Sequence, residues 1–165
     1  MKKYELTTET KVVSGHTLYR IRALVAFGSV DTGELGGWIE NETNLAQYGN
    51  AWVYGNARVY GNAQVHGKAQ VYGDAEVCGN AWVYGNAQVC DNAAIMTVSH
   101  IGSRFGTTTF FVLNNGKIGV QCGCFYGDID EFAAKVEQTH GNNQHGKAYK
   151  LAIELAKLRL QTRKE

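Results

Sequence analysis

Residues 49–96 read GNAWVY GNARVY GNAQVH GKAQVY GDAEVC GNAWVY GNAQVC DNAAIM, and a weaker copy, TNLAQY, precedes them at residues 43–48. No α-helix repeats every six residues, and a simple strand repeats every two. Six residues suit one short strand and one corner, so three such sides close a triangular turn of about eighteen residues. The repeat therefore predicts a parallel β-helix, with a mainly β fold.

Two positions of each hexad are expected to face the interior. The fifth position is Val or Ile and the third is Ala, which suits a narrow interior with room for one β-branched and one small side chain per side. Gly at the first position supplies the corner, because it adopts a left-handed backbone at little cost. The expected inward residues are Val53, Val59, Val65, Val71, Val77, Val83, Val89 and Ile95, with Ala51, Ala57, Ala63, Ala69, Ala75, Ala81, Ala87 and Ala93.

Outward residues eighteen positions apart are expected to stack in neighbouring turns, about 4.8 Å apart, over about three turns. Arg58 would then lie on Glu76, an opposite-charge pair that supports this register. Ser99 and Ile101 keep the phase beyond the last hexad. The expected columns are Tyr48–His66–Tyr84, Tyr54–Tyr72–Cys90, Tyr60–Cys78–Met96 and Asn44–Asn62–Asn80.

Both ends of a β-helix expose strand edges that need covering. Residues 4–27 are expected to form strands of an N-terminal cap, because TLYRIR follows the turn signal Ser14-Gly15. The GGWI sequence at 36–39 is expected to lead into the first turn. The expected domains are a cap over 1–36, the repeat over 37–102 and a C-terminal unit over 103–165.

The C-terminal unit is expected to begin with a β-hairpin. Asn115-Gly116 indicates a two-residue type I′ turn. That turn would pair Leu113 with Ile118, and the residue pairs that follow would share one largely apolar face with them. Phe110 would lie on the other face, over the glycines opposite. The remaining pairs would be Phe111 with Val120, Thr109 with Cys122 and Thr107 with Cys124.

Two helices are expected after the hairpin. Asp128 and Glu131 form a capping-box pattern before the first, and Gly141 is suited to ending it. The second helix, over residues 147–160, is apolar on more than one side, so it is buried on two sides or meets a partner. Its expected oligomer contacts are Tyr149, Ile153 and Leu160.

The array resembles the hexapeptide-repeat family, whose members fold as left-handed β-helices and commonly form trimers. The whole chain is similar to hexapeptide-repeat proteins of bacteriophages and prophages. Three blocks carry that similarity: TLYRIRAL with GELGGWIE, the GNAxVYGNA array, and TTTFF with CGCFYGDIDEF. The resemblance implies a left-handed homotrimer encoded by a phage. We know of no activity that the flanking blocks imply.

Outward aromatic residues are the main candidates for a contact surface, because aromatic rings with polar tips are enriched at interfaces. An oligomer contact is favoured over a ligand contact, and nucleobase stacking is a further alternative. Arg58 and Lys68 are the cations of the array, too few for a long nucleic acid. The candidates are Tyr48, Tyr54, Tyr60, Tyr72, Tyr84, Trp52 and Trp82.

Several other side chains are of types that serve in catalysis or ligand binding. Hexapeptide acyltransferases use a His as general base, but His66 here replaces Tyr in a column and no loop interrupts the array, so a structural role is favoured. Cys122 and Cys124 are expected to be buried structural thiols rather than metal ligands. An anion site is a further alternative, against ordinary strand and packing roles, for Ser103, Arg104, Thr107 and Thr109.

The bulk composition excludes some classes. A net charge of +1 gives no drive toward nucleic acid or an anionic membrane. No apolar run approaches the roughly 20 residues of a membrane span, and no signal peptide is evident, so we expect a cytoplasmic protein, in the host cell if a phage encodes it. We expect no cofactor and no metal. The sequence favours a non-enzymatic, self-associating binding module that engages a host protein or sequesters a small nucleotide in counter-defence. The alternative is an acyl-CoA-dependent transferase.

Overall fold

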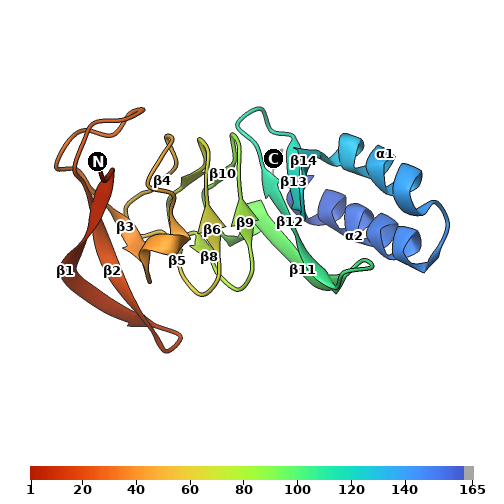
Figure 1. The fold of residues 1–165 in the computed structure, drawn as a ribbon, viewed down its shortest axis with the longest axis horizontal. Helices are drawn as coiled ribbons and strands as arrows, with labels where there is room; N and C mark the ends of the chain where they lie inside the picture. The colour runs from red at the N-terminus through yellow and green to blue at the C-terminus, as the bar shows by residue number, and fades with distance from the viewer. Residues whose placement is uncertain (162–165) are drawn as a thin grey trace. The chain divides into compact units, whose positions relative to one another are not determined.

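The structure, a computed structural model, describes residues 1–161, apart from the side chains of Ala93 and Gln161. The chain divides into two compact units, Met1–Asn92 and Ala93–Glu165, here called the first and second units. The fold is mainly β, and the helices α1 (Ile129–His140) and α2 (Gln144–Gln161) belong to the second unit (Figure 1).

The hexads form short parallel strands, each ending in the Val of its hexad. β4 pairs with β7 and β7 with β10, while β5 pairs with β8 and β6 with β9. Every one of these pairs joins residues eighteen positions apart, as Val53 with Val71 and Val71 with Val89, which confirms the expected register. The strands are β4 (Trp52–Val53), β5 (Arg58–Val59), β6 (Gln64–Val65), β7 (Gln70–Val71), β8 (Glu76–Val77), β9 (Trp82–Val83) and β10 (Gln88–Val89).

The interior of the array is the expected one. From Ala51 to Val89, each Ala at the third position and each Val at the fifth is at most 1% exposed. The Gly that opens each hexad from Gly49 to Gly85 has φ between 55° and 71°, the left-handed region that glycine enters at little cost. The expectation for Ala93 lies outside the described side chains. The backbone angles and the side-chain burial thus repeat with the same six-residue period, with the same positions turned inward in each of these hexads.

The N-terminal strands join the same sheet as the array. β1 (Tyr4–Val13) and β2 (His16–Ala23) form an antiparallel hairpin, β2 pairs with β3 (Leu35–Ile39), and β3 runs parallel to β5. Gly37 makes this approach feasible, because a Cβ there would lie 2.6 Å from the carbonyl oxygen of Ala57. The sheet therefore has the strand order β1-β2-β3-β5-β8, and the cap is continuous with the array.

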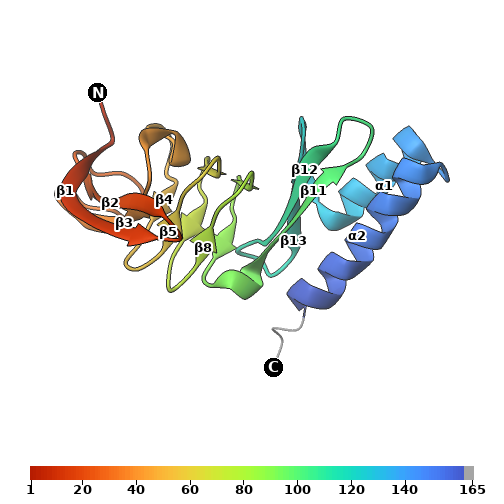
Figure 2. The same ribbon diagram turned by 90° about the horizontal axis from the view of Figure 1, so that it is seen from below.

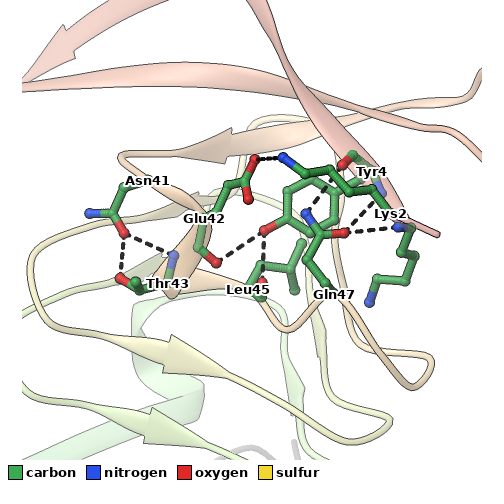
Figure 3. Close-up of polar contacts among 8 residues, drawn as sticks. Lys2, Tyr4, Asn41, Glu42, Thr43, Leu45 and Gln47 are labelled. Carbon is green, nitrogen blue, oxygen red and sulfur yellow. Dashed lines mark hydrogen bonds and ion pairs between the residues drawn. The ribbon is translucent and has the colours of Figure 1, made fainter.

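Polar contacts hold the start of β1 against the short helix η1 (Glu42–Asn44) and the segment after it (Figure 3). The Tyr4 hydroxyl donates to the Leu45 carbonyl at 2.7 Å, and Lys2 Nζ lies 2.7 Å from Glu42 Oε1. Lys3 is 4% exposed and its Nζ donates to the Ala51 carbonyl at 2.8 Å. Burial lowers the pKa of Lys3 to about 8 and raises the pKa of Tyr4 above its usual value. These buried polar groups anchor the N-terminal segment to the array.

The second unit holds an antiparallel sheet in the order β11-β12-β13-β14. The sequence placed residues 95–101 at the end of the array, because Ser99 and Ile101 keep its phase. In the structure they follow η2 (Asn92–Ala94) and form β11, which pairs with β12. Side chains alternate between the two faces of any β-strand, so the phase of Ser99 and Ile101 is the same for a strand of the array and for a strand of another sheet. The phase alone therefore could not show that residues 95–101 pair with β12. The strands are β11 (Ile95–Ile101), β12 (Gly106–Val112), β13 (Ile118–Cys122) and β14 (Phe125–Asp128).

The register of the β12–β13 hairpin differs from the expected one. Gly116 N donates to the Leu113 carbonyl at 2.9 Å, Leu113 N donates to the Lys117 carbonyl at 2.8 Å, and Gly116 has φ 79°. These contacts define a three-residue loop whose glycine is left-handed, rather than a two-residue type I′ turn. Phe110, rather than Phe111, therefore pairs with Val120. In the same way Val112 takes the place of Leu113 opposite Ile118, and Thr108 takes the place of Thr109 opposite Cys122.

A one-residue shift exchanges the two faces of a strand. Phe110 is consequently buried in the core, and it is Phe111 that lies over a glycine, since a Cβ on Gly119 would lie 2.5 Å from its ring. Cys122 is half-buried and accepts from Thr108 Oγ1 at 3.2 Å. The expectation of a buried Cys124 is wrong, because this residue is exposed in the turn between β13 and β14.

The helices cover one face of this sheet (Figure 2). The capping box of α1 is confirmed: Asp128 accepts from the N–H groups of Asp130 and Glu131, and Asp128 N donates to Glu131 Oε2 at 2.8 Å. Gly141 ends α1, with φ 53° and its N–H bonded to the Glu137 carbonyl. Helix formation therefore follows the local signals closely.

The assignment of oligomer contacts on α2 is wrong. Tyr149, Ile153 and Leu160 are at most 8% exposed and pack in the core of their own unit. Instead, Leu151, Leu155 and Leu158 are 74%, 52% and 72% exposed. The sequence predicts a helix that is apolar on more than one side, as the structure has it. Which of its apolar sides packs on the sheet depends on the rotation of the helix about its axis, which the tertiary contacts determine.

Candidate functional site

The outward column Tyr48–His66–Tyr84 is confirmed by ring contacts. The ring centroids lie 6.2 Å apart for Tyr48 and His66, and 6.1 Å apart for His66 and Tyr84. Trp82, from β9, lies 6.1 Å from the same imidazole. We call these four residues the aromatic face. Tyr48 is 68% exposed, Tyr84 42% and Trp82 41%, so the rings form an accessible patch centred on His66.

Both ring nitrogens of His66 have partners. Nε2 lies 2.8 Å from Gln64 Oε1, and the tautomer protonated on Nε2 donates to this oxygen. Nδ1, 3.4 Å from the Tyr48 hydroxyl, then accepts from that group. Burial, with a smaller contribution from the charge of Lys3, lowers the pKa of His66 below its usual value. His66 is therefore a neutral ring held within the aromatic face.

Two of the seven candidate aromatic residues are buried, although they point outward from the array as expected. Trp52 is fully buried, with its ring centroid 6.0 Å from that of Tyr4 and 5.3 Å from that of Phe27. Tyr60 is 6% exposed, and its ring centroid lies 4.8 Å from that of His16. Its hydroxyl donates a hydrogen bond to Glu76 Oε1. Both point away from the interior of the array, as expected, but the N-terminal cap covers them.

The remaining aromatic candidates are half-buried. Tyr54 and Tyr72 directly follow the paired strands β4 and β7, and the Tyr54 hydroxyl is 3.3 Å from Ser29 Oγ of the cap. The pair expected between Arg58 and Glu76 is present, with Arg58 Nη2 3.0 Å from Glu76 Oε2. The outward surface of the array is thus divided between covered and accessible aromatic residues.

The candidate anion residues of the second unit do not form one open site. Ser103 and Arg104 are exposed in the turn after β11, and Thr107 Oγ1 donates to Ser99 Oγ at 3.2 Å. Thr109 is 1% exposed, because its strand face is covered, so it is inaccessible to a ligand. Within residues 1–161, no group of three or more His, Cys, Asp or Glu side chains is placed to hold a metal ion. Among the described helices, none is long and apolar enough to cross a membrane.

Sequence reasoning missed a group of cations around Trp38. Lys11 Nζ lies 4.3 Å from the centroid of the indole, and Arg20 Cζ lies 5.7 Å from it. Arg58 pairs with Trp38 across the neighbouring strand. These residues come from four different strands and share no spacing or motif. Only the pairing of the cap with the array brings them together.

This geometry defines a β-solenoid built from a hexapeptide repeat, and comparison with known proteins agrees. The YdcK β-solenoid repeat family matches residues 51–67 and 69–85. A protein of Escherichia coli strain K12 named uncharacterized acetyltransferase YdcK is 39% identical over 61 residues, which cover 32% of this chain. The match spans 19% of the length of that relative. The similarity supports a hexapeptide-repeat-like family for the array.

Proposed function

We propose that the chain is a non-enzymatic binding module that self-associates through its aromatic face. The supporting observation is the accessible cluster of Tyr48, His66, Trp82 and Tyr84, in which three of the rings are more than 40% exposed. A contiguous exposed patch of this kind marks an interaction surface in soluble proteins. Tyr and Trp are also the residues that contribute most binding free energy at protein interfaces.

The finer features of this proposal rest on the resemblance to hexapeptide-repeat proteins. The array would wind left-handed in about three turns, and three copies would assemble. The similarity of the flanking blocks to phage and prophage proteins favours an accessory protein in the host cytoplasm. Such a protein would engage a host protein or sequester a small nucleotide to counter a host defence.

Sedimentation velocity tests the self-association. We expect the full chain to sediment as a trimer at micromolar concentration, and the double variant Trp82→Ser with Tyr84→Ser to sediment as a monomer under the same conditions. Loss of two central aromatic contacts typically weakens an interface by about thirtyfold or more, that is by about 2 kcal/mol or more. Phe105→Ser is the control, because Phe105 is 71% exposed and belongs to the second unit. A monomeric wild type, or a double variant that keeps the wild-type mass, would refute the proposal.

An acyl transferase is the second candidate, and the name of the YdcK relative favours it. In this chain, however, the partners of the two His66 nitrogens are the neutral side chains of Tyr48 and Gln64, which do not raise the basicity of the imidazole as a carboxylate would, and burial lowers its pKa. We therefore expect no acetyl-CoA binding at micromolar concentration by isothermal titration calorimetry. His66→Tyr, which restores the prevailing residue of the repeat, should preserve the melting temperature and the oligomeric state. Micromolar binding that His66→Tyr abolishes without changing the melt would establish the transferase instead.

A further inference from the structure

The sheet that joins the cap to the array carries a row of charged residues around one indole. Arg20 pairs with Trp38, Trp38 with Arg58, and Arg58 with Glu76, on adjacent strands. Glu9 of β1 extends the row, with its Oε1 3.5 Å from Arg20 Nη1. Residues directly opposite in a sheet point to the same face, so these side chains share one surface.

Lys11 adds a third cation to this surface. Its Nζ lies over the Trp38 ring, and no carboxylate of residues 1–161 lies within ion-pair distance of it. Burial, then the charges of Arg58 and Arg20, lower the pKa of Lys11 below its usual value. The three cations therefore lie close enough to repel one another.

The carboxylates nearby do not balance these charges. Glu9 lies at the outer side of Arg20, and Glu76 at the outer side of Arg58, at 3.0 Å. Glu9 and Glu76 each pair with one guanidinium group, and Glu40, two positions after Trp38, accepts from Gly61 N and lies 3.0 Å from His16 Nδ1, so among the described residues Lys11 has no carboxylate partner. In addition, Arg58 Nε is buried with no acceptor among the described residues, although the side chain is 28% exposed. The row is thus electrostatically incomplete at its centre.

We propose that Lys11, Arg20 and Arg58 bind a phosphate group on the surface over Trp38. Guanidinium groups match phosphate oxygens with paired donors, and an ammonium contributes a compact charge beside them. Three cations from three strands suit a group with three peripheral oxygens and two negative charges better than a planar carboxylate. Half-buried cations also attract an anion more strongly than fully hydrated ones. This site is separate from the aromatic face and does not depend on it.

The cations could alternatively do no more than cover the indole of Trp38, which is 8% exposed. The two roles differ in what Lys11→Met does to anion binding, since this change keeps the apolar stem on the ring and removes the charge. In either role the ligand-free variant loses the cation–π contact and is relieved of repulsion from Arg20 and Arg58. Only if Lys11 belongs to an anion site does the variant also lose affinity for the anion.

The experiment uses the full chain and sodium pyrophosphate at low ionic strength, with sodium chloride of matched ionic strength as the blank. We expect pyrophosphate to bind in calorimetry at or below about 1 mM and to raise the melting temperature. Lys11→Met should weaken this binding about tenfold or more, since a charge-assisted contact is lost. Arg20→Gln provides a second, independent variant with the same expectation.

Lys117→Met is the matched control, because Lys117 is exposed in the second unit and pairs with Asp128. It should bind pyrophosphate as the wild type does. The proposal is overturned if pyrophosphate shifts the melt no more than the chloride blank. It is equally overturned if Lys11→Met and Arg20→Gln both bind with wild-type affinity.

Discussion

Val71→Asp is expected to destabilise the first unit by about 4 kcal/mol or more, enough to unfold many domains of this size. Val71 is fully buried in β7, with β4 and β10 paired on its two sides. An ionised carboxylate there would have no partner, since the facing side chains are Val53 and Val89. Urea unfolding followed by circular dichroism measures the loss.

Gln70→Asp is the matched control for this change. Gln70 is the preceding residue on the same strand, and its side chain is half-buried and points outward. We expect a change below about 1 kcal/mol, as for most surface substitutions. Equal destabilisation by the two variants would contradict the inward phase of the repeat.

Trp52→Ala is expected to cost about 3–5 kcal/mol, the range for removing a large buried aromatic side chain. Trp52 is fully buried between the array and the rings of Tyr4 and Phe27, so alanine would leave a cavity where the cap meets the array. The free energy of unfolding of the first unit reports this loss.

Trp82→Ala is the comparison, because Trp82 occupies the same position of an identical hexad, GNAWVY. Trp82 is 41% exposed, and its replacement should cost about 1 kcal/mol or less. If the two variants lost stability equally, the N-terminal cap would not cover Trp52 as the structure has it.

The array could be predicted from the sequence because its determinants are local and repeated. Each hexad carries a glycine where the chain turns through a left-handed conformation, and an Ala and a Val at the two inward positions. A wrong phase would expose the apolar residues of every hexad at once, so the pattern admits one solution. The column through Tyr48, His66 and Tyr84 followed directly from that solution.

The candidate site could be predicted only in part. The sequence identified Tyr48, His66, Trp82 and Tyr84 as outward residues, and these form the aromatic face. It could not distinguish Trp82 from Trp52, because the two hexads are identical and only the cap differs between them. The cations around Trp38 were missed for the same reason, since their proximity depends on which strand pairs with which.

The sequence by itself thus determined the repeat, its inward phase, the eighteen-residue register and the capping box of α1. Each of these depends on residues a few positions apart or on a period repeated many times. Only the tertiary structure decided what covers Trp52 and Tyr60, how β12 pairs with β13, and which stripe of α2 is buried. These features depend on contacts between distant segments, where a one-residue shift or a small rotation changes the buried face without changing the local pattern.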